Sequence, residues 1–219
     1  MRGKWSTLYR AAATALISAG LAFVPGTGRA ADPGGGASAG NRLQSNDWAE
    51  GTPGKDNGAT RDYYNRAGLL EWKHPMGDWQ DAQGAAQGSA AYATATVAPE
   101  HKGNAVEWDV TGLVRQWTDG KYTNQGMFLR VVGGRGTRVF GSREQRDAAR
   151  RPQLVLSGDN WSLALAPQAD TFLDRSTYRC TGNLDSLRVS SEPQHALLRF
   201  SLPQEATTGN VRRARPCAC

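Results

Sequence analysis

Cysteine and histidine are both scarce in this sequence, with three of each. The cysteines are Cys180, Cys217 and Cys219, all near the C-terminus, and an odd number cannot pair completely. A disulfide-rich scaffold is therefore excluded, although Cys180 could still bridge to one tail cysteine. The histidines lie far apart at His74, His101 and His195, without the spacing of zinc ligands.

Recognisable catalytic groupings are missing as well. No histidine has a partnered serine or cysteine in a known nucleophile motif. The turn 133–136 lacks the following helix and the Gly-Lys-Ser/Thr ending of a phosphate-binding loop. Many acidic pairs exist, but nothing singles one out as the two carboxylates of a glycosidase. We therefore predict that the chain is not an enzyme.

The longest apolar run lies at the N-terminus. Arg2, Lys4 and Arg10 precede the apolar stretch Ala11–Val24, and Gly28-Arg29-Ala30 supplies a small-x-small cleavage pattern. The run is short for a membrane span, so residues 1–30 are predicted to be a secretory signal, with an uncleaved anchor as the alternative. Residues 31–40 are predicted to be a linker rich in small residues and proline.

Removal of that signal also removes most of the positive charge. Residues 1–30 contain four basic residues and no acid, so the formal charge falls from +6 to +2. A charge of +2 does not favour nucleic acid as a partner. We predict a secreted or cell-surface protein with no membrane span after cleavage, forming part of a larger multidomain protein.

The stretch 106–156 has the clearest secondary-structure pattern. Val110, Leu113, Val114 and Trp117 have the spacing of one helix face, and Asp109 is placed to cap that helix. Strands are predicted at 127–132, 137–140 and 152–156, with a turn at 133–136. A second strand-rich unit is predicted at 165–210, followed by an irregular tail at 211–219. The pattern predicts an all-β, antiparallel, jelly-roll-like β-sandwich with one short helix.

Several short sequence motifs between residues 41 and 157 resemble the DNRLRE-type domain. This domain is related to the disaggregatase repeat and to an alginate-binding carbohydrate-binding module family. The matching motifs are Asp47-Trp48-Ala49-Glu50-Gly51, Gly58-Ala59-Thr60, Trp108–Trp117, Asn124–Leu129, Phe140–Glu144 and Arg151–Val155. The resemblance implies a jelly-roll-like sandwich found in large secreted bacterial and archaeal proteins. It also implies a carbohydrate ligand.

The order of the resembling parts departs from the family pattern. Residues 41–157 resemble the C-terminal (trailing) half of a DNRLRE-type domain. The N-terminal (leading) half follows later, at 165–210, in motifs such as Ala169-Asp170-Thr171 and Leu197–Leu202. One explanation is a truncated product with two incomplete copies. The other is that the late half completes the early one as a permuted sandwich, and we adopt this as a hypothesis because isolated halves would expose open strand edges.

Aromatic side chains are the first candidates for carbohydrate binding. Tyr63, Tyr64, Trp72 and Trp79 lie among turn residues, where their rings could stack on sugars; the alternative is a small core beneath a long loop. Trp48 beside Glu50 could do the same, but a buried framework role is favoured. Trp108 and Trp117 are predicted to be core residues.

Arginines and loop acids complete the candidates. Arg130, Arg138 and Arg143 could bind uronate carboxylates, with Arg130 and Arg138 approaching each other if their strands pair. For Arg143 an internal ion pair with Glu144 is favoured. No cofactor is expected beyond a structural Ca²⁺, for which the candidate ligands are Asp56, Asp62, Asp78 and Asp81, although solvated loop acids are the favoured interpretation.

Together these features predict a secreted, non-catalytic carbohydrate-binding module whose partner is a polysaccharide, plausibly one that contains uronates. One alternative is a structural or adhesion repeat of a bacterial cell-surface protein without a glycan ligand. Another is a fragment of a polysaccharide-degrading enzyme.

Overall fold

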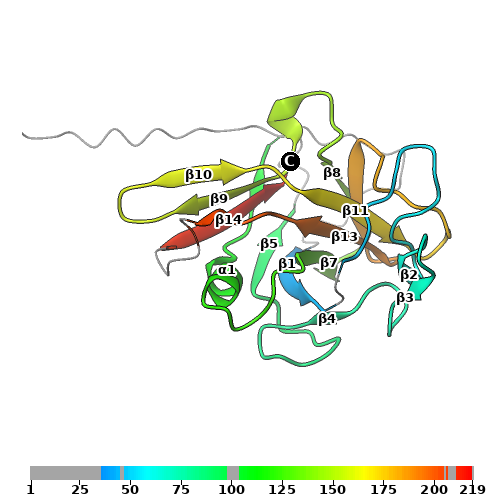
Figure 1. Cartoon of the computed structure of the whole chain (residues 1–219), viewed down its shortest axis with the longest axis horizontal. Coiled ribbons are helices and arrows are strands. Elements are labelled where there is room, and N and C mark those ends of the chain that lie inside the picture. Colours follow the sequence, from blue (N-terminus) through cyan, green and yellow to red (C-terminus); the bar gives the residue numbers. More distant parts are fainter. Residues whose placement is uncertain (1–35, 45–46, 98–103, 205, 207–210, 219) are drawn as a thin grey trace, which may run out of the picture.

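The computed structural model describes residues 36–44, 47–97, 104–204, 206 and 211–218. The predicted signal, residues 1–30, lies outside the described residues. The described part is mostly β-structure, with antiparallel sheets in a sandwich-like arrangement and a single α-helix (Figure 1). This confirms the predicted fold class. None of its helices has the length and apolar character needed to span a membrane.

The elements follow one another closely along the chain. Their bounds are β1 (Gly36–Leu43), β2 (Tyr63–Asn65), β3 (Leu70–Glu71), β4 (Trp79–Gln80), β5 (Ala93–Thr96), β6 (Val106–Glu107), α1 (Thr111–Thr118), β7 (Met127–Gly133), β8 (Thr137–Gly141), the 3₁₀ turn η2 (Ala148–Arg150), β9 (Gln153–Ser157), β10 (Ser162–Leu165), β11 (Ala169–Asp174), β12 (Ser186–Ser190), β13 (Gln194–Arg199) and β14 (Arg213–Ala218).

The larger sheet has eight strands and is built around β7. Its order is β4-β1-β7-β13-β12-β8, with β5 also pairing with β1 and β11 with β13. β7 and β8 do not pair across the turn 133–136, which was the condition for Arg130 and Arg138 to approach each other. β13 occupies one edge of β7, with Leu197 opposite Phe128, and β8 pairs with β12 instead. Arg130 and Arg138 are therefore not cross-strand neighbours.

The smaller sheet has the order β10-β9-β14-β6 and corrects the predicted tail. Residues 213–218 were expected to be irregular, but they form β14, where Ala214 lies opposite Leu156 of β9 and Cys217 opposite Glu107 of β6. The reason is a weak alternation of small residues: Ala214 and Pro216 are buried between the more exposed Arg213 and Arg215. β2 and β3 form a separate two-stranded sheet.

The predicted linker, residues 31–40, also needs correction. Residues 36–40 belong to β1, whose backbone pairs with β5 on one side and β7 on the other. Backbone hydrogen bonds supply this pairing, so the strand forms without the apolar alternation by which strands are recognised in a sequence.

Early and late segments of the chain share both sheets. In the larger sheet, β13 pairs with β7, and β12 with β8. In the smaller one, β14 pairs with both β6 and β9. The leading and trailing segments thus lie in one body, the arrangement on which the permuted-sandwich hypothesis depends.

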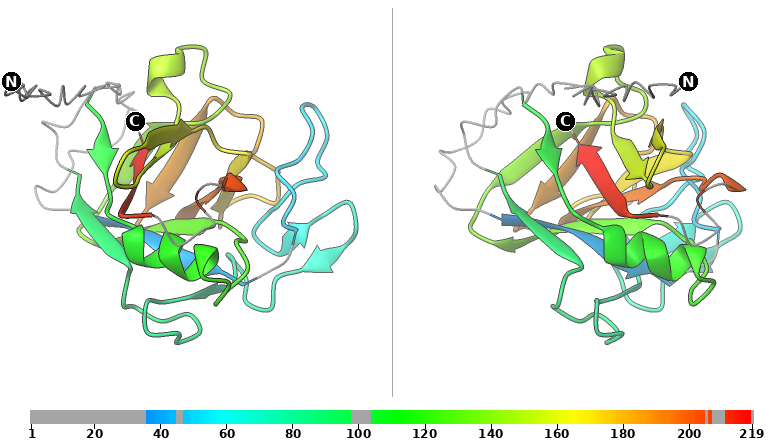
Figure 2. Two further views of the ribbon diagram at one scale, coloured as in Figure 1. Left: turned by 60° about the vertical axis from the view of Figure 1, so that its left-hand side comes forward. Right: turned by 90° about the vertical axis from the view of Figure 1, so that its left-hand side faces the viewer.

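Helix α1 packs beside β14, as two views of the molecule show (Figure 2). Leu113, Val114 and Trp117 are buried, as their spacing predicts. The predicted cap needs correction: the N-cap is Val110, without a side-chain cap hydrogen bond, and Asp109 precedes it. The Asp109 carboxylate still accepts the backbone N–H of Thr111, the first helical residue, at 3.0 Å.

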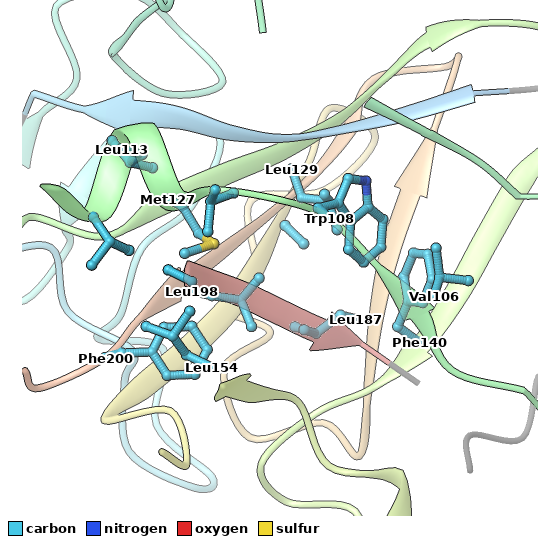
Figure 3. Close-up of a cluster of buried hydrophobic side chains, with 14 of the residues drawn as sticks. Val106, Trp108, Leu113, Met127, Leu129, Phe140, Leu154, Leu187, Leu198 and Phe200 are labelled. Atoms are coloured by element: carbon cyan, nitrogen blue, oxygen red, sulfur yellow. The ribbon is translucent and has the colours of Figure 1, made fainter. Parts of the chain in front are cut away.

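Two hydrophobic clusters lie in the molecule, because alternate residues of a strand point to opposite sides of the sheet. The sheet core includes the buried residues Val106, Trp108, Val110, Leu113, Met127, Leu129, Phe140, Leu154, Leu187, Leu198 and Phe200 (Figure 3). The loop core consists of Leu43, Trp48, Ala59, Trp72, Met76, Phe128, Ala169, Leu173 and Leu197. Phe128 belongs to the loop core, whereas its neighbours Met127 and Leu129 belong to the sheet core. The loops between β1 and β4 therefore form an extra layer.

Candidate functional site

The most exposed aromatic ring among the described large hydrophobic side chains is that of Tyr178, which is 59% exposed. The guanidinium carbon of Arg61 lies 4.0 Å from the centre of this ring. Arg66, Arg175 and Arg179 lie close by on the same two loops, 52–66 and 175–180. We call these five residues the Tyr178 surface: Arg61, Arg66, Arg175, Tyr178 and Arg179.

Polar contacts fasten the two loops of the Tyr178 surface together. Asp56 forms an ion pair with Arg66 at 2.7 Å and accepts the N–H of Cys180 at 2.8 Å. The N–H of Gly58 contacts Cys180 Sγ at 2.9 Å, and Arg61 donates to the carbonyl of Arg175 at 3.4 Å. The two loops run side by side at one end of the molecule (Figure 1). The ring is consequently held on a fixed platform.

The charges of this surface are only partly neutralised. Arg61 pairs with Asp62 at 3.0 Å and Arg66 with Asp56. Arg175 and Arg179 are exposed and have no ion pair with any described residue. The hydrogen bond from Cys180, helped by the nearby cations, lowers the pKa of Asp56. Two guanidinium groups thus remain available to an anionic ligand.

A polar pocket adjoins the Tyr178 surface at Arg175. Its volume is about 300 Å³, and its lining residues are Thr137, Asp174, Arg175, Ser176, Ser190, Glu192, Pro193 and Gln194. Hydroxyl, carboxylate and amide groups of this kind can exchange hydrogen bonds with sugar hydroxyls. The pocket and the ring together offer polar contacts beside a stacking surface.

The cysteines do not form the bridge that remained open in the sequence. Cys180, in segment 175–180, is a free thiol, so it forms no bridge to the tail, and Cys217 lies in β14. Burial, together with a hydrogen bond to Asp56, raises the pKa of the Cys180 thiol to about 11. Cys219 lies outside the described residues.

The predicted aromatic ligands lie mostly in the loop core. Trp72 is only 5% exposed, and its Nε1–H donates to the carbonyl of Thr60 at 2.8 Å. Tyr64 packs edge-on against it at 5.8 Å, and Trp79 stacks on Phe128 at 4.8 Å. Tyr63 is half-buried in β2. The structure therefore favours the alternative of a core beneath the loop. Trp72 is buried and cannot contact a ligand at the surface.

The three predicted arginines are separated. Arg130 lies 5.6 Å from the ring centre of Trp79 and donates to the carbonyls of Gly88 and Ser89, while its partial burial lowers the pKa of the guanidinium. Arg138 is buried, and its Nε donates to the carbonyl of Val97. Arg143 is paired with Glu144 at 2.8 Å, as favoured from the sequence. Among these predicted residues, Arg130 and Trp79 are the only arginine and ring that lie together.

The predicted core tryptophans are confirmed. Trp48 is fully buried and donates its Nε1–H to the carbonyl of Gln125 at 2.9 Å. Trp108 and Trp117 are buried in the sheet core. Glu50 accepts the N–H of Asp170 at 2.7 Å, which is a framework role rather than a contact with solvent.

The four predicted metal ligands are used by the protein itself. Asp56 and Asp62 form ion pairs with arginines. Asp78 accepts the N–H groups of Lys73 and His74 at 2.7 and 2.8 Å. Asp81 accepts those of Gln83, Ala85 and Ala90 at 2.9–3.2 Å. These carboxylates stabilise loops, Asp78 and Asp81 from buried positions, and the four do not converge on one point.

A different set of acids does converge. Glu50, Glu144 and Asp170 each place one carboxylate oxygen within 4.8 Å of the others, and we call them the carboxylate cluster. Arg143 lies among them, with its Nε 2.8 Å from Glu144 and 3.2 Å from Glu50. Burial raises the pKa of Asp170 to about 8 and also raises the pKa of Glu50.

Comparison with known protein families gives a match for part of the chain. Residues 53–156 match the family model of the disaggregatase related repeat domain. This segment is therefore similar to the disaggregatase related repeat domain. No curated protein and no solved structure gave a significant match to the chain. The matched range includes β2 to β8 and most of β9, whereas β1 and the later strands β10 to β14 lie outside it.

The Tyr178 surface joins the repeat domain to this later segment. Arg61 and Arg66 lie inside the matched range, whereas Arg175, Tyr178 and Arg179 lie outside it. None of the five was predicted as a ligand residue from the sequence. The available signal was a tyrosine flanked by arginines, Arg175-Ser176-Thr177-Tyr178-Arg179, between two predicted strands. The closeness of Arg61 to this segment depends on the tertiary fold.

Proposed function

We propose that this protein is a secreted, non-catalytic carbohydrate-binding module that binds acidic polysaccharide through the Tyr178 surface. The observation that carries the proposal is a highly exposed tyrosine ring stacked against Arg61 at 4.0 Å. An aromatic face of this kind can stack on the apolar C–H face of a pyranose. Arg61 holds the ring in one orientation, which reduces the entropy lost on binding.

Charge supports an acidic ligand. Arg175 and Arg179 are exposed beside the ring and have no carboxylate partner among the described residues. A guanidinium group can bind a uronate carboxylate through two parallel hydrogen bonds. The polar pocket next to Arg175 would receive the hydroxyl groups of a neighbouring sugar.

The acids on this surface support a binding role over a catalytic one. Asp56 and Asp62 are held by Arg66 and Arg61, and the pKa of Asp56 is lowered. A glycosidase acid needs the opposite condition, a raised pKa that keeps the proton available at neutral pH. Asp56 is therefore not arranged to act as a general acid, and Asp62 is engaged by Arg61.

Affinity electrophoresis tests the proposal directly. The chain without residues 1–30 should be retarded in gels containing alginate or pectin and should migrate freely in gels containing a neutral glucan. Retardation should weaken as NaCl is added, because salt screens exposed charges. Tyr178→Ala should bind about tenfold more weakly, and Leu163→Ala, an exposed apolar residue of β10, serves as the matched control.

Two outcomes would contradict the proposal. Equal migration in all gels would favour a structural or adhesion repeat without a glycan ligand. Release of unsaturated uronates or new reducing ends by the purified chain would instead show an enzyme.

A further inference from the structure

The carboxylate cluster joins three segments that are distant in the sequence. Glu50 comes from the loop after β1, Glu144 from the turn after β8, and Asp170 from β11. One oxygen of each side chain lies within 4.8 Å of the others. None of these three acids belongs to the Tyr178 surface or to the four acids predicted as metal ligands.

Two oxygens of the cluster are buried without a hydrogen-bond partner: Oδ1 of Asp170 and Oε2 of Glu144. Asp170 is 0% exposed. Its other oxygen accepts the N–H of Arg143 at 2.8 Å, so Asp170 is fixed in place while Oδ1 remains unsatisfied. A buried carboxylate oxygen with no partner is rare in proteins and needs a compensating group.

The charge of the cluster is also incomplete. The guanidinium group of Arg143 forms ion pairs with two of the three carboxylates: its Nε lies 3.2 Å from Glu50 and 2.8 Å from Glu144. Asp170 has no ion pair with any described arginine or lysine, so a divalent cation would supply the positive charge that its ionised form lacks. An all-oxygen ligand set suits a hard cation such as Ca²⁺.

The backbone around Glu50 is held closely. A Cβ atom at Gly58 would lie 2.3 Å from the Glu50 carbonyl oxygen, and one at Gly182 would lie 2.1 Å from it. Side chains are therefore excluded at both positions, and the loop carrying Glu50 is clamped between them. A site held in this way loses little conformational entropy when a ligand binds.

We propose that Glu50, Glu144 and Asp170 bind Ca²⁺, with Asp170 Oδ1 and Glu144 Oε2 as ligand atoms. The ion would clasp the loop layer to β11 and to the turn after β8. It would link the repeat domain to the segment that follows it. The proposal does not depend on polysaccharide binding.

Calorimetry and thermal unfolding of the chain without residues 1–30 test this site. After EDTA treatment and dialysis, CaCl₂ should bind with one ion per chain and should raise the unfolding temperature, because the ion binds only the folded state. Asp170→Asn and Glu144→Gln should each weaken Ca²⁺ binding by at least about tenfold. Asp159→Asn is the matched control, since Asp159 is an exposed acid paired with Arg212 after β9.

Absence of both binding heat and a thermal shift at millimolar CaCl₂ would overturn the proposal. Ca²⁺ binding that is unchanged in Asp170→Asn and Glu144→Gln would overturn it as well. Circular dichroism establishes that each variant is folded. If Asp170→Asn does not fold, Glu144→Gln decides the result, because Glu144 is partly exposed. Tyr178→Ala should bind Ca²⁺ as the wild type does, which separates this site from the polysaccharide surface.

Discussion

The two cores of the molecule are built by different rules. The sheet core takes its side chains from alternate positions of regular strands and from α1, and its largest members are apolar. The loop core covers the other side of β7 and is closed by irregular chain rather than by a second sheet. Its tryptophans donate hydrogen bonds to backbone carbonyls: Trp48 to Gln125 and Trp72 to Thr60.

This difference shows what irregular chain requires in order to cover a sheet. Strands satisfy their own backbone groups, so their buried side chains can be purely apolar. Loops leave N–H and C=O groups unpaired, and these must be met by side chains such as Asp78, Asp81 and Trp72. The polar groups buried in the loop layer are therefore structural, and sequence inspection alone does not distinguish them from ligand residues.

The largest expected effect comes from removing the late strands altogether. A chain that ends at Leu156 loses β13, the partner of β7, and β14, the partner of β9. It also loses Leu187, Leu198 and Phe200 from the sheet core. We expect no cooperative unfolding transition in urea for this truncated chain, because both cores lose one side. A midpoint equal to that of the longer chain would show that residues 53–156 form an independent sandwich.

A pH titration should separate the two cores next. His195 packs against Phe128 at 4.8 Å and Trp79 at 6.0 Å, and burial, reinforced by Arg130, lowers its pKa to about 4. Between pH 6.5 and 4 the unfolded chain takes up a proton that the folded chain does not. This contribution to stability is therefore complete above pH 6.5 and falls as the pH decreases towards 4.

The difference between the wild type and His195→Gln in urea unfolding at pH 7 and pH 4.5 measures this loss, which we expect to be on the order of 2–3 kcal/mol for His195. His195→Gln should lose correspondingly less stability over the same interval. An equal acid loss in the variant and the wild type would show that the loop core does not control it.

The smallest effect compares two buried tryptophans. Trp72 donates its Nε1–H to Thr60, whereas Nε1 of Trp117 is buried without a hydrogen-bond partner. Trp72→Phe should therefore cost about 1–2 kcal/mol more than Trp117→Phe, because it leaves a buried carbonyl unsatisfied. Free energies of unfolding from urea titrations give this difference. The reverse order would mean that hydrogen bonds do not distinguish the loop core from the sheet core.

The regular parts of the fold were predictable because their signal is local. The helix face of Leu113, Val114 and Trp117 and the strand 169–174 follow from spacing and alternation. β1 and β14 were not predicted, since their pairing is supplied by backbone groups and by neighbouring strands. The local sequence pattern of a segment does not show which other strand will pair with it.

The candidate site was less predictable for the same reason. Arg143 and Glu144 are adjacent in the chain, and their ion pair was foreseen. Arg61 and Tyr178 are distant in the sequence and meet only because two loops are fastened through Asp56, Gly58 and Cys180. The same holds for Glu50, Glu144 and Asp170, whose convergence requires the complete fold.

The central claim is that the Tyr178 surface binds an acidic polysaccharide without cleaving it. Titration of alginate oligosaccharide into wild-type, Tyr178→Ala, Arg179→Ala and Arg212→Ala proteins measures this most directly. We expect the first two substitutions to weaken binding and Arg212→Ala, an exposed arginine at β14, to leave it unchanged. Equal affinity in all four proteins, or no binding in any of them, would contradict the account.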